Sequence, residues 1–177
     1  MLPAKLNIEF RKVSADEWFT IHTIAHKTWP TAYGEMISIQ QLNYMLDLIY
    51  SESSIRRQIE NMRHEYIIGY QSGKQVGFAS IEQHFKNANQ LMIHKLYVLP
   101  EFQGRGLGKI FIKYITTLAL DASHDILCLK VFHKNQKGIA FYKSIGFLIY
   151  GEEETDIGNG YEILDYVMTK NVRQSHF

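Results

Sequence analysis

The chain has 177 residues, of which 46% are hydrophobic and 21% charged, and it contains 3 prolines. This size and composition are typical of one folded globular domain. Its 19 basic and 18 acidic residues leave a net charge of +1, which gives no indication of a nucleic-acid surface. No apolar run approaches the roughly 18 residues that span a bilayer, and the first residues lack a signal-peptide profile.

The single cysteine, Cys128, lies in the apolar stretch 126–129. One cysteine cannot form an internal disulfide, which fits a reducing compartment. A free cysteine in such a stretch is usually a buried packing residue rather than a nucleophile. We therefore expect a cytoplasmic protein with one domain over residues 1–170, a loose tail over 171–177, and neither a membrane nor a nucleic acid as partner.

In chain order, a strand is expected over residues 7–13, where apolar and polar side chains alternate. Capping patterns then predict three helices, the first of which should end before Pro30. These helices run from Ser14 to about Lys27, from Ser38 through Ile49, and from Ser51 or Ser54 to about Arg63.

The rest of the chain alternates between strand and helix patterns. The expected strands cover residues 65–71, 75–85, 90–99, 126–132, 147–150 and 161–169, and the expected helices cover residues 106–123 and 135–144. Early helices, a meander of strands and then strand–helix–strand units predict an α/β protein with a mixed sheet.

A glycine loop joins the strand that ends near Val98 to the helix after it, with the sequence Gln103-Gly104-Arg105-Gly106-Leu107-Gly108. Glycines allow a left-handed backbone and leave no side chain to block a ligand. The N-terminus of the helix adds free N–H groups and the positive end of the dipole, so the loop predicts an anion site for phosphate.

Two common phosphate motifs do not fit this loop. The dinucleotide motif would need a third glycine at Lys109, and the P-loop would need glycine at Gln103 and serine or threonine at Ile110. From the loop alone, a plain glycine-rich turn that caps a helix remains the alternative.

The wider sequence resembles the GCN5-related N-acetyltransferase (GNAT) superfamily. Residues 103–108 are similar to its Q/R-x-x-G-x-G/A loop, and residues 135–147 are similar to its N-x-x-A-x-x-F-Y-x-x-x-G-F motif. Gly138 stands where alanine is usual, and we expect it to weaken the helix by about 1 kcal/mol without touching ligand contacts. The resemblance spans roughly residues 65–166, while the first 60 residues match only as a variable two-helix region.

This resemblance implies a mostly antiparallel mixed sheet that splays in its middle, flanked by helices, with acetyl-CoA as co-substrate in the split. It implies that the Val98 N–H binds the thioester oxygen, that the loop amides hold the pyrophosphate, and that Tyr142 acts as acid toward the CoA thiolate. The residues it assigns to acetyl-CoA are Leu96, Tyr97, Val98, Gln103, Gly104, Arg105, Gly106, Leu107, Gly108, Lys109, Asn135 and Tyr142. Apart from the motif, the preferred reading of Tyr142 is a helix aromatic packed on the sheet, and Asn135 also fits a helix N-cap.

An alkylamine must lose a proton before it attacks, so a base is needed. Strict alternation would place His94 on one face with Met92, Leu96 and Val98, and arylalkylamine N-acetyltransferases resemble this strand in carrying a histidine there. We expect His94 to be the base, with Glu82 on the neighbouring strand as the second candidate; an ordinary sheet histidine is the alternative.

The acceptor amine is expected between the early helices and the last hairpin, at Trp29, Tyr33 and Glu35. The sequence around these residues loosely resembles the bacterial polyamine-acetylating branch. The late hairpin is acidic, which suits a cationic acceptor, although an acidic hairpin is more often simply solvated.

We therefore expect direct acetyl transfer to a small-molecule primary amine, possibly a polyamine, in a ternary complex. No metal ligand set is expected, because His22 and His26 lack a third partner. A non-catalytic acyl-CoA-binding module and a protein N-terminal or lysine acetyltransferase are the alternatives, and the sequence leaves monomer and homodimer open.

Overall fold

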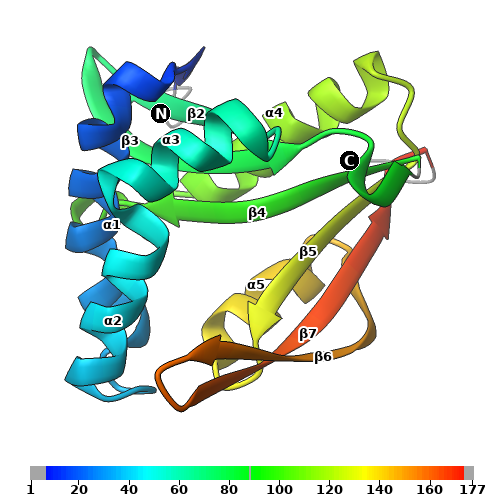
Figure 1. The fold of residues 1–177 in the computed structure, drawn as a ribbon. Coiled ribbons are helices and arrows are strands. Elements are labelled where there is room, and N and C mark those ends of the chain that lie inside the picture. The colour runs from blue at the N-terminus through cyan, green and yellow to red at the C-terminus, as the bar shows by residue number, and fades with distance from the viewer. Residues whose placement is uncertain (1–6, 88, 174–177) are drawn as a thin grey trace.

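The computed structural model describes residues 7–87 and 89–173. These residues form a seven-stranded sheet with the order β1-β2-β3-β4-β5-β7-β6 (Figure 1). Strands β4 and β5 are parallel, and all other neighbouring pairs are antiparallel. The predicted mixed, mostly antiparallel α/β sheet is confirmed.

The strands are β1 (Glu9–Lys12), β2 (Glu65–Gln71), β3 (Lys74–Glu82), β4 (Gln90–Val98), β5 (Ile126–Phe132), β6 (Leu148–Gly158) and β7 (Tyr161–Asn171). The α-helices are α1 (Trp18–Tyr33), α2 (Ile39–Tyr50), α3 (Glu52–Asn61), α4 (Leu107–Asp121) and α5 (Gln136–Ser144). Three short 3-10 helices are η1 (Ala15–Glu17), η2 (Phe85–Asn87) and η3 (Pro100–Phe102).

The sheet separates two hydrophobic cores. Helices α1, α2 and α3 stand together on one face (Figure 1) and enclose a core that includes Ile21, Tyr50 and Phe78. Helices α4 and α5 pack on the other face around Phe111 and Phe147. Side chains of β4 therefore contribute to one core or the other according to the direction in which they point.

The sheet splays at β4 and β5. The two strands pair from Gln90–Ile126 to Ile93–Leu129 and no further. Beyond that point β5 continues beside β7 alone, and Figure 1 shows β4 and β5 diverging toward the side occupied by α2 and α5. This is the splay in the middle of the sheet that the family resemblance implied.

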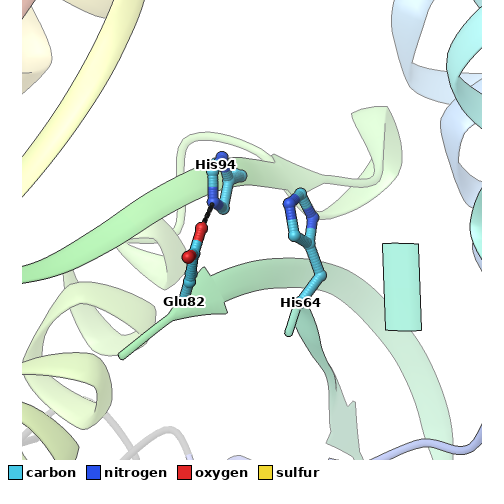
Figure 2. Close-up of side chains that lie close together, drawn as sticks. All are labelled: His64, Glu82 and His94. Carbon is cyan, nitrogen blue, oxygen red and sulfur yellow. Dashed lines mark hydrogen bonds and ion pairs between the residues drawn. The ribbon is translucent and has the colours of Figure 1, made fainter. Parts of the chain in front are cut away.

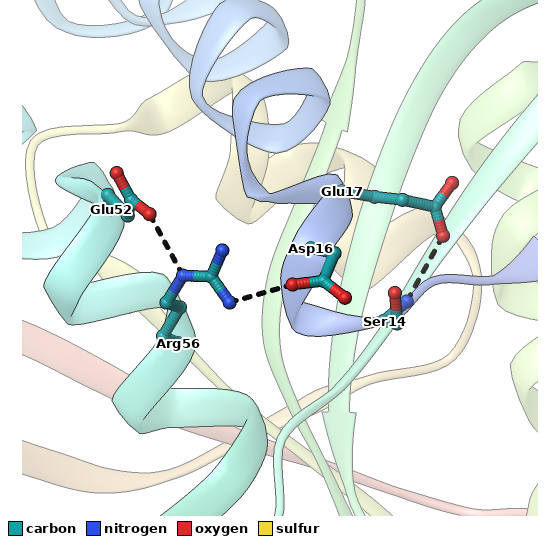
Figure 3. Close-up of polar contacts among 5 residues, drawn as sticks. All are labelled: Ser14, Asp16, Glu17, Glu52 and Arg56. Atoms are coloured by element: carbon teal, nitrogen blue, oxygen red, sulfur yellow. Dashed lines mark hydrogen bonds and ion pairs between the residues drawn. The ribbon is translucent and has the colours of Figure 1, made fainter.

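The capping box that the sequence predicted is present at the N-terminal end of η1. The Ser14 backbone N–H donates to the Glu17 carboxylate at 3.2 Å. Between these two residues, Asp16 accepts from the Arg56 guanidinium at 3.0 Å, and Arg56 also donates to Glu52 at 3.0 Å (Figure 3). These contacts tie η1 to α3, although both carboxylates of the pair are largely exposed and contribute little stability.

The prediction that the first helix ends before Pro30 is wrong. Helix α1 continues through Pro30 to Tyr33. A proline inside a helix removes one backbone hydrogen bond, but Trp29 is buried in the core on this face and Tyr33 packs against it. Tertiary packing of the last turn therefore outweighs the local cost, and it brings Trp29 and Tyr33 over β4.

The C-terminal boundary also differs from the prediction. Strand β6 is longer than the expected 147–150, because it forms a long hairpin with β7. Strand β7 extends through Asn171, and Val172 is buried against the α4 core. The loose tail expected from 171 is therefore wrong for residues 171 and 172, and residues 174–177 lie outside the described part.

Candidate active site

A cleft of about 470 Å³ lies where β4 and β5 separate. One wall is the edge of β4 that β5 has left, since the other edge of β4 stays paired with β3. Leu96, Tyr97 and Val98 all line this cleft. An extended molecule laid along the edge would therefore meet strand backbone, as an added strand would.

The direction of the Val98 N–H follows from its neighbour. The Leu99 N–H donates to the Val76 carbonyl of β3 at 2.9 Å. Successive N–H groups of a strand point to opposite edges, so the Val98 N–H points into the cleft. On the same edge, the Gln103 side-chain amide donates to the Val98 carbonyl at 2.9 Å, which fixes the end of the strand beside the glycine loop.

The glycine loop closes one end of the cleft. Gly104 and Gly106 have φ of +74° and +78°, a conformation that residues with a side chain rarely adopt. Gly106 is the N-cap of α4, so the first-turn N–H groups of the helix point out of this end. Residues of the loop that line the cleft are Gln103, Gly104, Gly106, Leu107, Gly108 and Lys109.

Arg105 is the one loop residue that does not line the cleft. Its guanidinium donates to the Glu101 carbonyl at 2.9 Å and lies 5.4 Å from the centre of the Phe102 ring. Sequence reasoning missed Lys137, which also lines the cleft. Its position two residues after Asn135, in the second motif, was the available signal.

Asn135 is the N-cap of α5, where its Oδ1 accepts from the Gly138 N–H at 2.9 Å. A Cβ on Gly138 would lie 2.8 Å from Asn135 Nδ2. This glycine therefore makes room for the Asn135 side chain, which lines the cleft, and the expectation that Gly138 does not affect ligand contacts stays a prediction.

Tyr142 lines the cleft from α5, with its ring packed against Phe141 and Phe147. Burial raises the pKa of its hydroxyl above the ordinary value. Because a raised pKa keeps the proton on the oxygen at neutral pH, Tyr142 can act as a proton donor.

A β-bulge in β4 corrects the predicted face of His94. Ser80 pairs with Lys95 while its neighbour Ile81 pairs with Ile93, so His94 is an extra residue without a partner on β3. Leu96 packs on the α4 side and Tyr97 on the α1 side. The bulge shifts the alternation, and His94 does not share a face with Leu96 and Val98 as predicted.

His94 lies between Glu82 and His64 (Figure 2). Its Nε2 is 2.9 Å from Glu82 Oε2, and its ring stacks on His64 with centroids 3.9 Å apart. Burial, followed by the charges of Lys95 and Lys130, lowers the pKa of His94 to about 3. Burial lowers the pKa of His64 to about 3 as well, so both rings are neutral at pH 7. His64 was not identified from the sequence, because only the folded sheet brings it to His94.

One ligand atom from each of His64, Glu82 and His94 lies within 4.8 Å of the others. The histidine rings are stacked at an interplanar angle of 13°, so their in-plane lone pairs run side by side rather than converging. The hydrogen bond to Glu82 also makes Nε2 of His94 unavailable as a metal ligand. This arrangement does not match a tetrahedral metal site, and the expected absence of a metal stays a prediction.

Lys95, the residue after the bulge, has a buried ammonium group. Its ammonium donates to Gln58 Oε1 at 2.6 Å and lies 5.3 Å from the ring centre of Tyr66. Burial lowers its pKa to about 7. The group is therefore half-protonated near neutral pH, a feature the sequence did not indicate.

A second cavity of about 300 Å³ adjoins the first on the α1–α2 side. Trp29 and Tyr33 line it, as predicted, whereas Glu35 is exposed and does not. The five residues that line both cavities are Tyr33, His94, Lys95, Tyr97 and Lys130. His94 therefore lies where the two cavities meet.

Comparison with known proteins agrees with this geometry. The sequence model described as "Acetyltransferase (GNAT) family" matches residues 19–147. An uncharacterized N-acetyltransferase of Mycobacterium bovis is 25% identical over 158 residues, which cover 89% of this chain and 97% of that protein. The spermidine N(1)-acetyltransferase of Thermoplasma acidophilum is 23% identical over 155 residues, covering 85% and 92%.

A solved structure shows the same fold. The PaiA N-acetyltransferase of Thermoplasma acidophilum, crystallised with coenzyme A, superimposes with a TM-score of 0.75 at 23% identity, covering 93% of this chain and 99% of the other. The chain belongs to the GNAT acetyltransferase family. It is an acetyl-CoA-dependent N-acetyltransferase. No helix in the described ranges combines the length and apolar composition that a membrane span requires.

Proposed function

We propose that acetyl-CoA lies in the cleft between β4 and β5 and that a primary amine reaches it from the second cavity. The observation that carries the proposal is the meeting of the two cavities at His94. The cleft residues fit acetyl-CoA, because an open strand edge suits the amides of pantetheine and the α4 N-terminus suits its pyrophosphate. Lys109 and Lys137 line the same cleft and add positive charge to it.

Acetyl-CoA supplies an acetyl group activated as a thioester. The Val98 N–H donates to the thioester oxygen and stabilises the negative charge that develops there. His94 accepts the proton of the attacking amine, and the Glu82 carboxylate stabilises the imidazolium that forms. Tyr142 donates its proton to the departing thiolate.

Because its pKa is lowered, the His94 ring is neutral at pH 7 and holds a lone pair on one nitrogen. The same lowered pKa makes the ring alone a weak base, so it depends on the neighbouring carboxylate to accept a proton. Burial disfavours the protonated ring. When the ring takes up a proton, the Glu82 carboxylate stabilises its positive charge and so opposes this effect of burial. The pair therefore acts as one unit in which Glu82 is a positioning residue.

The acceptor class is a small-molecule primary amine. A polyamine belongs in the test because one relative is named a spermidine acetyltransferase. The experiment is the release of free thiol from acetyl-CoA with a panel of amines and peptides, together with calorimetry of CoA binding. Thiol release with small amines supports the proposal. Binding without release indicates a non-catalytic acyl-CoA-binding module, and release with peptides alone indicates a protein acetyltransferase.

A further inference from the structure

The second cavity has a polar end and an apolar end. The polar end is the junction with the CoA cleft, where His94, Lys95 and Lys130 lie. The remainder of the cavity is dominated by apolar side chains from five different elements. They are Met45, Ile49, Phe85, Met92, Phe132 and Ile163. An amine that presents its nitrogen to His94 must therefore place the rest of its body against an apolar surface.

The charges in this cavity do not suit a molecule with several ammonium groups. Asp165 is the one carboxylate that lines it, and two lysines line it as well. Lys130 forms an ion pair with Glu153 at 2.5 Å. Spermidine with one nitrogen at His94 would bring two further ammonium groups into a cavity that Asp165 alone lines as a carboxylate, so at least one of them would lose its hydration without meeting an opposite charge.

The acidic hairpin that suggested a polyamine lies largely outside the cavity. Glu152, Glu154, Asp156 and Glu162 are exposed on β6 and β7 and do not line it. Glu153 is engaged with Lys130. Of these six acidic side chains only Asp165 faces the acceptor, which is enough for one positive charge.

We infer that the acceptor is a hydrophobic primary monoamine, an arylalkylamine or alkylamine, rather than a polyamine. The inference rests on the proposed function and defines its substrate class. The cavity volume of about 300 Å³ lies at the lower end of the roughly 300–1,000 Å³ of small-molecule sites, which suits a small amine. Spermidine is of similar size, so charge rather than volume separates the two classes.

The first test compares kcat/KM for 2-phenylethylamine, hexylamine and spermidine by thiol release, with the acetylated product identified by mass spectrometry. We expect both monoamines to exceed spermidine by at least tenfold. Equal or better turnover of spermidine overturns the inference and leaves the proposed function intact. Absence of thiol release with every amine and peptide, while CoA still binds, overturns the proposed function and the inference with it.

The second test places a carboxylate in the apolar end. Met45→Glu on α2 should raise the ratio of spermidine to 2-phenylethylamine turnover at least fivefold. Leu48→Glu is the matched control, because Leu48 lies on the same helix, is 42% exposed and does not line the cavity. Ile163→Glu on β7 replaces Met45→Glu if the latter does not fold by circular dichroism. An unchanged ratio in a folded cavity variant contradicts the inference.

Discussion

Glu82 and His94 lie on neighbouring strands with Glu82 Oε2 2.9 Å from His94 Nε2 (Figure 2). An ionised carboxylate only accepts hydrogen bonds, so Nε2 carries the proton and Nδ1 holds the lone pair. In Figure 2 the second ring nitrogen is turned away from Glu82. The bond therefore selects the tautomer that leaves one nitrogen able to accept a proton from an amine.

The first prediction concerns this bond. Glu82→Gln removes the charge that stabilises the imidazolium and allows the ring to adopt the other tautomer, so kcat should fall about 10²-fold. KM for acetyl-CoA should stay unchanged, since Glu82 does not line the CoA cleft. The measurement is steady-state kinetics across pH. Glu65→Gln, on β2, is the control, and equal loss in both variants would contradict the specific role.

The features of the proposed CoA site could be predicted because their residue types are dictated by the backbone. Gly104 and Gly106 adopt positive φ, which few other residues tolerate, so their spacing alone marks the loop. The Asn135 cap and the α4 N-terminus follow from equally local rules. Such features are visible in a single sequence because neighbouring residues form them.

The acceptor side was less predictable because distant residues form it. The bulge at His94 inserts one extra residue into β4, and no residue of the sequence marks its position. Beyond the bulge, the side chains of β4 point to the faces opposite to those that strict alternation predicts. His64 reaches His94 only through the pairing of β2, β3 and β4. Likewise, Pro30 predicts a helix end, and only the packing of the α1 core overrules it.

The second prediction tests the glycine loop. Gly106→Glu places a carboxylate where phosphate is expected and strains a backbone with φ of +78°, so CoA binding should be abolished in calorimetry. Gly73→Glu is a matched control, because Gly73 has φ of +74° with equally open surroundings but lies in the β2–β3 turn. If a folded Gly106→Glu variant binds CoA with wild-type affinity, the phosphate site lies elsewhere.

The third prediction concerns Tyr142. Tyr142→Phe keeps the ring that packs on Phe147 and removes the proton donor, so kcat should fall about 10²-fold with little change in KM. A raised hydroxyl pKa also means that no alkaline limb from Tyr142 should appear below pH 10. Steady-state kinetics with acetyl-CoA measure both. Wild-type kcat in the variant, with chemistry shown to be rate-limiting, would refute the acid role.

The fourth prediction is loss of stability in mild acid. His64 is buried with a folded-state pKa of about 3, against 6.5 when exposed. The unfolded chain therefore binds more protons between these values, and the free energy of unfolding falls as the pH drops from 6.5 toward 3. One histidine contributes a slope of up to about 1.4 kcal/mol per pH unit. Urea unfolding at pH 7 to 4 should show a shallower slope in His64→Phe, and an unchanged slope would contradict this.

The last prediction concerns Lys95, whose effect lies on the alkaline side. Burial lowers its pKa from 10.5 in the unfolded chain to about 7. Below pH 7 the folded protein therefore contains a buried positive charge, which lowers its free energy of unfolding. Gln58 supplies a hydrogen bond at 2.6 Å but no opposite charge. Between pH 7 and 10.5 the unfolded chain binds more protons than the folded one, and the free energy of unfolding should rise with pH across this window.

Lys95→Met should abolish that rise and stabilise the protein at pH 7, because a buried ammonium without a charged partner is replaced by an apolar chain of similar length. Urea unfolding of both proteins from pH 7 to 10 measures the difference, and Lys74→Met is the control, since Lys74 is exposed at the start of β3. The variant should also move the acidic limb of kcat/KM upward, because the Lys95 charge lowers the pKa of His94. A wild-type pH slope in Lys95→Met would show that the ammonium is solvated in the folded protein, and an acidic limb that stays in place would separate Lys95 from the proton transfer at His94.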